Sequence, residues 1–540
     1  MKKFKFYLLG IMIIIALTGC SGKNSSSKEL NMAITAAPLS ADPTMLYDIS
    51  TGIMCRFFCS TLYEYNNKKE LKPALAESYE VSDDGLTYTF HLKDNLKWSD
   101  GRPLTADDFV FGFKRFSDPN VGSNAVYLIT DCCKLKNAES ILAGELPLSE
   151  LGVYAPDKKT FIVELEEPCT YFTDLLTNSN FTPCNEDFYH SAGNKYGSSH
   201  EYVLSCGPYI LDRYEPLATQ IHFVKNPYYY NSDSILLNGV NLQVIANLQQ
   251  ALMCYETGTI DIMEVNGELL ELTEDDPELN ILPGASLYFF FLNQNGSRPE
   301  LMNKNIRMAI SKSIDRQDLT DNLLRSGFSP MTRIIPPGFY YETDGSDFAL
   351  KQDLYDEYAV YDPDAALAYW KQGLSELGVS SITFELVFNS DKIAECEALA
   401  AQMERNLPGL KIELKGVPFK ERSALRAKGE YEIMLSNWFP DYSDPTSFYA
   451  LYLSNATAKS YHNPKYDSIY EQTCTPEMSK NPDERSKLMH KLEDIIMEDA
   501  GTVPIYTTGN TYLIRSNISG FQVPPTGTGI IVTGLSKEVE

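Results

Sequence analysis

After residue 28 the chain of 540 residues contains no stretch rich in Pro, Gly and Ser that could link separate domains. A chain of this length exceeds one hydrophobic core, since domains average about 150 residues. Strand and helix patterns alternate throughout, which is typical of an α/β protein with several sheets. We therefore predict about three or four compact units that share strands or between which the chain crosses several times, rather than domains joined in a row.

The strand patterns are of two kinds. LTYTFHL, KTFIVEL and SITFELVFN alternate apolar and polar residues, which predicts strands with one buried face. LYFFFLN is a continuous apolar run, which predicts a buried strand. In the first and third segments the expected inward-facing residues are Leu86, Tyr88, Phe90, Leu92, Ile382, Phe384, Leu386 and Phe388.

Three segments have the start and the apolar stripe of a helix. YDPDAALAYWKQGLSELG has Asp362 as N-cap, Pro363 at the first helical position and Gly378 as its stop. NPDERSKLMHKLEDIIMEDAG repeats this device up to Gly501, and LTADDFVFGFKRF begins at Thr105. The expected stripes are Leu367, Trp370, Leu374 and Leu377; Leu488, Leu492 and Ile495; and Phe109, Phe113 and Phe116.

The N-terminus is the most specific local signal. Lys2, Lys3 and Lys5 precede a short apolar run, which is followed by the segment LTGC ending at Cys20. This pattern resembles a bacterial lipobox, in which the chain is cut before the Cys and its sulfur carries a diacylglyceryl group. Residues 1–19 are thus expected to be a signal peptide, and residues 20–28 a lipidated Cys and a flexible tether. An uncleaved anchor helix is the alternative, although the run is short for a bilayer.

Composition limits the classes of function. The net charge of -27 disfavours binding to nucleic acid and to anionic lipid. Aromatic residues make up 12%, which fits either binding surfaces or a Tyr-rich core. Besides Cys20 there are ten Cys with no C-x-x-C or zinc-type spacing, so small buried side chains or one or two disulfides are both open.

No local motif for catalysis, for a metal or for a cofactor is present. The chain lacks H-E-x-x-H, G-x-x-x-x-G-K-[ST] and G-x-S-x-G. The acidic run ELLELTEDDPEL lacks the alternating ligands and the glycine of a calcium loop, so we interpret it as solvated surface. We therefore expect a binding protein, not an enzyme, with no cofactor and no metal.

Several segments, taken in order, resemble the peptide/nickel class of bacterial solute-binding proteins, the extracytoplasmic subunits of ABC importers. They run from about residue 30 to about residue 521, and DYSDPTSF is most similar to the oligopeptide-binding members. The segments are LSADP, LKPALAESYEVSDDGLTYTFHLKDNLKWSDGRPLTADDFVFGFKR, CGPYILDRYEPLATQIHFVKNPYYYN, ALMCYETGTIDI, FFFLNQNGSRPELMNKNIRMAISKSIDRQDL, YDPDAALAYWKQGLSELG, NWFPDYSDPTSFY, YHNPKYDSIY and ERSKLMHKLEDIIMEDAGTVPIY.

The resemblance implies a two-lobed α/β fold of the periplasmic-binding-protein type, class II-like, with an additional domain. Three domains result, and the chain crosses between the lobes twice, which fits the missing linkers. Mapped onto this sequence, domain I is 29–51, 203–288 and 510–540; domain II is 52–202; and domain III, the second lobe, is 289–509.

The resemblance also implies a ligand site. Family members bind an extended peptide as an added strand between the lobes. Their ligand for the peptide's α-ammonium is the Asp of a Trp-x-x-Asp-Tyr element, which Trp438, Asp441 and Tyr442 match. The matching backbone ladder residues are Asn437, Trp438 and Phe439 on one lobe and Ala37, Pro38 and Leu39 on the other.

This sequence departs from the family pattern in places. Pro38 has no N–H to donate, and Pro440 stiffens the approach to Asp441. Tyr127 falls one residue short of a family pocket tyrosine and is not assigned that role. For Asp441 the alternative is a surface or turn-capping acid, whereas Asp444 before Pro445 is expected to be a structural cap.

We therefore expect a monomeric lipoprotein on the outer face of the bacterial cell membrane. It is expected to capture oligopeptides and deliver them to the permease and ATPase subunits of an importer, touching the membrane through its lipid anchor only and binding no nucleic acid. The alternatives are the same fold binding an oligosaccharide, a nickel complex or haem, or acting as a receptor for peptide pheromones.

Overall fold

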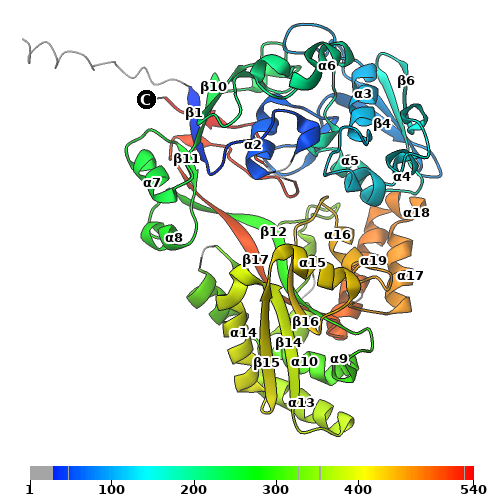
Figure 1. Ribbon diagram of the computed structural model, residues 1–540, viewed down its shortest axis with the longest axis vertical. Helices are drawn as coiled ribbons and strands as arrows, with labels where there is room; N and C mark the ends of the chain where they lie inside the picture. The colour runs from blue at the N-terminus through cyan, green and yellow to red at the C-terminus, as the bar shows by residue number, and fades with distance from the viewer. Residues whose placement is uncertain are drawn as a thin grey trace, which may run out of the picture.

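A computed structural model describes residues 28–539 except 47, 326, 352–353, 459 and 528. The predicted signal peptide and Cys20 lie outside the described residues. The described chain forms two lobes, one above the other in Figure 1. The second lobe is the part of the chain between the middle of Leu279–Leu292 (β12) and the middle of Thr502–Ile514 (β17); the first lobe contains the rest.

One mixed sheet runs through both lobes in the order β15–β14–β16–β12–β17–β11–β1–β10–β9–β8, with β13 paired to β17. Its other strands are β1 (Glu29–Ile34), β8 (Tyr209–Arg213), β9 (Gln220–Lys225), β10 (Gly239–Val244), β11 (Ile262–Glu264), β13 (Ser329–Pro330), β14 (Ile382–Asn389), β15 (Leu410–Val417) and β16 (Ile433–Trp438). The expected alternation in β14 is confirmed, because Ile382, Phe384, Leu386 and Phe388 are all buried.

The strands β12 and β17 carry the chain between the lobes, so the two crossings implied by the resemblance are present. They pair antiparallel, and their register is interrupted between Pro283 and Leu287. At Gly284 the strands approach so closely that a Cβ would lie 2.0 Å from the Thr508 carbonyl oxygen. Only glycine fits at this position, which lies within the interrupted part of the pairing.

The first lobe contains a second, antiparallel sheet in the order β4–β5–β7–β6. Its strands are β4 (Ala76–Val81), β5 (Thr87–Leu92), β6 (Val153–Asp157) and β7 (Thr160–Glu164). The predicted helix that begins after Thr105 is α3 (Ala106–Phe116), and Thr105 forms a capping box with Asp108. The expected stripe is confirmed, since Phe109, Phe113 and Phe116 are buried against this sheet.

The other two predicted helices are α13 (Pro363–Leu377) and α19 (Pro482–Glu498). Asp362 caps α13 by accepting from the Ala365 N–H at 2.9 Å, and Gly378 ends it with φ of 69°. The helix α19 ends before the predicted stop, and its most buried apolar residues are Met489, Leu492 and Ile496, not Leu488 and Ile495. Glu493 is buried on the same face and accepts from the N–H groups of Ile334 and Ile335.

The remaining elements are shorter or lie around the sheets. They are α2 (Ile49–Phe58), β2 (Tyr63–Tyr65), β3 (Leu71–Pro73), α4 (Ala138–Leu142), α5 (Phe172–Leu175), α6 (Glu186–Ala192), α7 (Leu248–Glu256), α8 (Glu268–Thr273), α9 (Pro299–Met302), α10 (Lys304–Lys312), α11 (Arg316–Asp318), α12 (Leu354–Ala359), α14 (Ile393–Asn406), α15 (Phe419–Lys428), α16 (Thr446–Tyr449), α17 (Pro464–Thr473), α18 (Pro476–Ser479), β18 (Ile518–Ser519) and β19 (Ser536–Lys537).

The buried apolar side chains form separate clusters in the two lobes. One first-lobe cluster joins β1 and α2 to β8–β10 and to the C-terminal segment, and a second surrounds β4–β7. Two further clusters lie on the two faces of the sheet in the second lobe. Most of α2 packs in the cluster that contains β1. The second domain was predicted to begin at residue 52, which lies inside this helix. The domain limits stay a prediction.

The ten cysteines other than Cys20 are free thiols in the structure. Seven are buried and three are half-buried. They fill space in the core as small apolar side chains do, which is the first of the two readings left open by their spacing.

Candidate functional site

The strand β16 has a free edge at the boundary between the lobes. On one side it pairs with β12 along its whole length, but on the other it pairs with β14 only up to Met434. The next carbonyl, that of Leu435, accepts from Arg422 Nη1 at 3.1 Å. Because backbone groups of alternate residues point to the same side of a strand, Asn437 presents its N–H and C=O to this edge, and Phe439 continues it.

Asp441 lies two residues after Phe439, beyond the end of this edge. Its Oδ1 accepts from the hydroxyl of Tyr127, which belongs to the first lobe, at 2.9 Å. Among the described residues no cationic side chain pairs with Asp441. Burial raises the pKa of Asp441, and the hydrogen bond from Tyr127 opposes that rise. The site therefore holds a half-buried carboxylate whose one partner among the described residues is neutral, which suits a cationic ligand group.

A cavity of about 370 Å³ lies beside Asp441. Asn124, Tyr127 and Asn178 line it from the first lobe, and Phe439 and Asp441 line it from the second. Its walls combine amide, hydroxyl and carboxylate groups with two aromatic rings and several apolar side chains. A space of this size and polarity holds a small ligand group together with water.

The segment 37–39 of the first lobe lies beyond the end of β1 and is not part of a strand. The Leu39 N–H already donates to Thr51 Oγ1 at 3.1 Å, and the Pro38 carbonyl accepts from the Tyr214 hydroxyl at 3.2 Å. Only the N–H and C=O of Ala37 and the C=O of Leu39 have no partner among the described residues. The first lobe therefore offers few backbone groups to a ligand.

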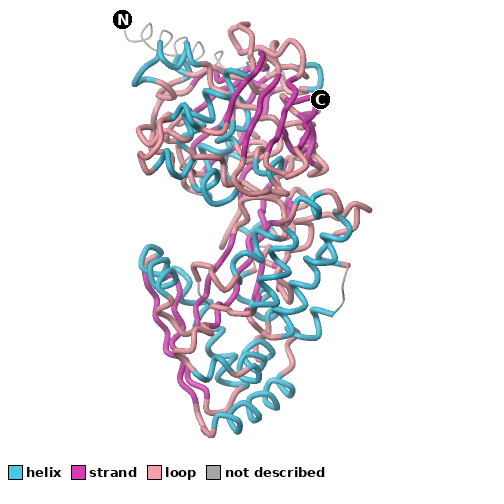
Figure 2. Tube along the Cα trace, turned by 90° about the vertical axis from the view of Figure 1, so that its right-hand side faces the viewer, coloured by secondary structure: helices cyan, strands magenta, loops and turns pink. Residues whose placement is uncertain are grey.

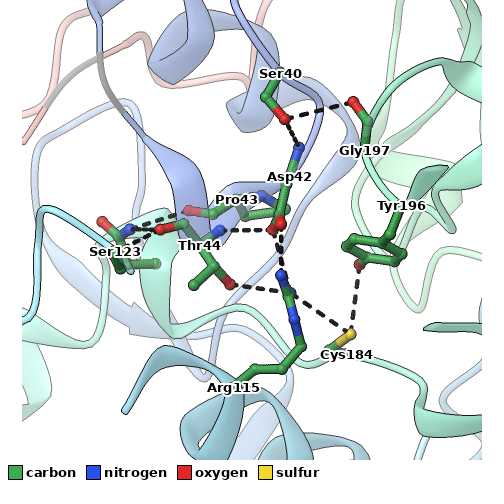
Figure 3. A network of polar contacts seen from close by, with 10 residues as sticks. Ser40, Asp42, Pro43, Thr44, Arg115, Ser123, Cys184, Tyr196 and Gly197 are labelled. Carbon is green, nitrogen blue, oxygen red and sulfur yellow. Dashed lines mark hydrogen bonds and ion pairs between the residues drawn. The ribbon is translucent and has the colours of Figure 1, made fainter. Parts of the chain in front are cut away.

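A buried ion pair fixes the turn that follows this segment (Figure 3). Arg115 of α3 donates to both carboxylate oxygens of Asp42, at 3.2 Å for Oδ1, and to Thr44 Oγ1 at 3.1 Å. The two charged side chains are only 6% and 9% exposed. The rings of Tyr189 and Tyr196 lie 4.5 and 4.8 Å from the guanidinium. The network thus ties the turn after residues 37–39 to the helix that supports the second sheet.

Backbone contacts in the same network leave no space at Gly197. Its carbonyl accepts from the Ala41 N–H at 2.8 Å and from Ser40 Oγ at 3.4 Å. Its φ is +72°, and a Cβ there would lie 2.7 Å from Asp42. Glycine is required here both by the left-handed backbone and by the close approach of the turn.

The two aromatic residues before Asp441 have different surroundings. Trp438 is half-buried, packs on the second-lobe core and donates from Nε1 to Ser447 Oγ at 3.1 Å. Phe439 is 46% exposed and lies between the 370 Å³ cavity and a smaller one of about 130 Å³ near the crossing strands. Phe439 therefore forms a wall of both cavities, while Trp438 anchors the strand.

Tyr442 and Asp444, which follow Asp441, are buried. Tyr442 does not line the 370 Å³ cavity; its ring stacks on Tyr171 of the first lobe. Asp444 pairs with Arg485 at 2.6 and 2.9 Å and accepts from the Thr446 N–H at 3.0 Å. Asp444 is therefore a structural acid, as its position before a proline suggested.

Sequence reasoning considered Tyr127 without assigning it to the site, and it did not find the Asp42–Arg115 pair. In the sequence, Tyr127 falls one residue short of the position of the family's pocket tyrosine. It is also 314 residues away from Asp441 in the chain. Asp42 and Arg115 both lie in the quoted segments LSADP and DDFVFGFKR, but nothing in either segment indicates the other. Only the folded structure brings these residues together.

Two further searches gave negative results within the described residues. No three His, Cys, Asp or Glu side chains in that part of the chain meet in a way that could hold a metal ion. No helix there has both the length and the apolar character needed to cross a bilayer.

Comparison with known proteins gives consistent matches. Residues 70–460 match the model of the bacterial extracellular solute-binding proteins, family 5. The chain is 31% identical to a dipeptide-binding protein of Lactococcus lactis subsp. cremoris over 555 residues, covering 98% of each chain.

Two solved structures are similar over almost the whole chain. Peptide-bound OppA of Listeria monocytogenes is 30% identical with a TM-score of 0.68, covering 95% of this chain and 99% of that one. The unliganded open form of MppA, a periplasmic murein tripeptide-binding protein, is 25% identical with a TM-score of 0.83, covering 95% and 98%. The arrangement of the lobes is thus more similar to the open form than to the peptide-bound one.

Proposed function

Because the chain belongs to family 5 of the bacterial extracellular solute-binding proteins, we propose that it captures peptides with a free amino terminus between its lobes and delivers them to an ABC importer. Proteins of this family bind solutes outside the cytoplasm and are not enzymes. The observation that carries the proposal is the free edge at Asn437 and Phe439, which leads to a carboxylate without a cationic partner among the described residues.

The free edge supports binding through the peptide main chain. A peptide added beside β16 gains hydrogen bonds worth about 0.5–1.5 kcal/mol each, whatever its side chains. Ala37 and the Leu39 carbonyl face the peptide from the first lobe, with fewer groups than Asn437 and Phe439 supply together. This arrangement gives affinity without strong sequence preference.

The carboxylate of Asp441 fixes the register of the peptide, that is, which peptide residue lies opposite each residue of the β16 edge. The α-ammonium of a peptide donates to Asp441, and the Tyr127 hydroxyl keeps the carboxylate oriented. Trp438 and Tyr442 hold the two ends of this turn in the core rather than touch the ligand themselves. The cavities on either side of Phe439 receive peptide side chains together with water.

Titration calorimetry with unblocked tri- to pentapeptides tests the proposed function. We expect binding heat for peptides of different sequence, and no heat for oligosaccharides, nickel chelates or haem. Mass spectrometry of ligands that copurify with the protein should find short peptides. Heat with sugars or chelates, and none with unblocked peptides, would contradict the proposal.

The lipid anchor is a separate part of the proposal. Cleavage before Cys20 and transfer of diacylglycerol to its sulfur would hold the protein as a monomer on the outer membrane face. Changing Cys20→Ser should release most of the protein from membranes or leave it with an uncleaved leader. The check is membrane fractionation with mass measurement of the mature chain. Cys254→Ser, at a half-buried thiol of the described chain, is the control and should stay on the membrane.

A further inference from the structure

The two lobes touch at a second place, away from the crossing strands. The ring of Tyr442 stacks on that of Tyr171 with centroids 3.5 Å apart and planes parallel within 1°. Tyr442 is 5% exposed and belongs to the buried cluster around β4–β7, although its backbone belongs to the second lobe. A second-lobe side chain is thus part of the first-lobe core.

A hydrogen bond beside this stack fixes the next residue. Asp174 of α5 accepts from the Ser443 N–H at 2.6 Å, and its other oxygen accepts from the Tyr65 hydroxyl of β2. Ser443 in turn donates from Oγ to the Phe339 carbonyl within its own lobe, at 3.0 Å. Burial raises the pKa of Asp174 to about 6, although both hydrogen bonds oppose the rise. Tyr442 is thus buried, whereas Tyr171, Asp174 and Ser443 are half-buried and line a cavity of about 750 Å³.

This contact exists while the lobes are apart. Figure 2 shows the two lobes meeting on one side and diverging on the other, and the TM-score is higher against the open form than against the peptide-bound form. In Figure 1 the crossing strands β12 and β17 lie near the centre, and α5 approaches the second lobe beside α18 at the right-hand edge. The lobes are therefore joined at the crossing strands and, separately, around Tyr442 and Ser443, with the Tyr127–Asp441 hydrogen bond and the exposed Asp83–Lys480 ion pair as further contacts.

We propose that Tyr171 and Asp174 are positioning residues for Asp441: by holding Tyr442 and Ser443 against the first lobe, they complete the ammonium site before the lobes close. This inference rests on the proposed function for its ligand. Two fixed points define a line about which the lobes rotate, and a group beside that line moves little. Asp441 is one residue from the contact, so its bond to Tyr127 persists as β15 and α13, at the far end of the second lobe, move most.

An order of events follows from this geometry. The amino terminus of the peptide docks first, at a site already made from both lobes. The rest of the peptide then pairs with the edge of β16 as the lobes close over it. Ligand binding selects the closed arrangement because only there do the groups of Ala37 and Leu39 reach the peptide.

The test is the ratio of affinities for a free tripeptide and for its N-acetylated form. In the double variant Tyr171→Ala, Asp174→Ala we expect this ratio to fall about tenfold, because Asp441 is no longer held in place. Asp174→Asn keeps an oxygen acceptor for Ser443 and should retain the ratio. The control is Asp83→Ala with Lys480→Ala, which removes an exposed ion pair between the same lobes and should leave the ratio unchanged.

Hydrogen exchange at the Ser443 amide is a second readout, which needs no ligand. In the wild type we expect protection both without and with peptide, and loss of protection in the double variant. An unchanged affinity ratio in a folded double variant, or an unprotected Ser443 amide in either wild-type state, would overturn the inference. Should the wild type bind no peptide at all, the proposed function fails, while the exchange measurement still tests the contact.

Discussion

Replacing Asp441 by alanine should weaken the binding of unblocked peptides by about 2–5 kcal/mol, since it removes one partner of an enclosed charge pair. The ligand's ammonium would be left between the lobes with only the neutral Tyr127 beside it. N-acetylated peptides, which carry no ammonium, should lose far less. Titration calorimetry with matched free and acetylated tripeptides measures both losses.

The control for this prediction is Asp441→Asn, which keeps the shape of the side chain and removes its charge. It should behave like the alanine variant toward free peptides. Because burial raises the pKa of Asp441, wild-type affinity should fall at acid pH as this carboxyl takes up its proton, and the asparagine variant should lack that fall. Equal losses for free and acetylated peptides would remove the role assigned to Asp441.

The second large effect is expected at Arg115. Changing Arg115→Met leaves Asp42 buried without its cation, which typically costs about 3–5 kcal/mol of unfolding free energy. The loss should also loosen the turn after residues 37–39, so the variant should bind peptide more weakly as well. Denaturant unfolding and calorimetry on the same preparation measure the two effects.

A double variant separates charge from packing at this position. With Asp42→Leu added to Arg115→Met, no buried charge remains, and part of the lost stability should return. Lys159→Ala is the surface control: it breaks an exposed pair with Asp94 and should change stability by less than about 1 kcal/mol. An Arg115→Met protein as stable as the wild type would show that Asp42 needs no cation.

Local features of the fold followed from the sequence where short-range chemistry determines them. Asp362 and Thr105 cap their helices as predicted, because an N-cap acts on residues only three positions away. In α19 the prediction of Leu492 is confirmed, but Leu488 and Ile495 are each one residue away from the buried Met489 and Ile496. On the same buried face lies Glu493, whose backbone partners are about 160 residues earlier in the chain, at Ile334 and Ile335, where no local pattern could indicate them.

The candidate site likewise combines residues that the sequence indicated with contacts that only the folded chain shows. Asp441 and the ladder residues came from resemblance to a family and remain a proposal, while the family and its two-lobed fold are shown. The sequence could not show that Thr51 and Tyr214 already occupy two of the three first-lobe ladder positions. Nor could it show that Tyr442 leaves its own lobe, because a tyrosine in a ligand motif and one in a core look alike in sequence.

The shared sheet has a mechanical consequence. Since β12 and β17 pair on both sides of the short interruption that contains Gly284, the two lobes are joined by a two-stranded ribbon rather than by loose chain. Such a ribbon resists stretching and permits twisting over only a few residues. Opening and closing then follow a single path of rotation. A captured molecule therefore meets the same opposing surface each time the lobes close.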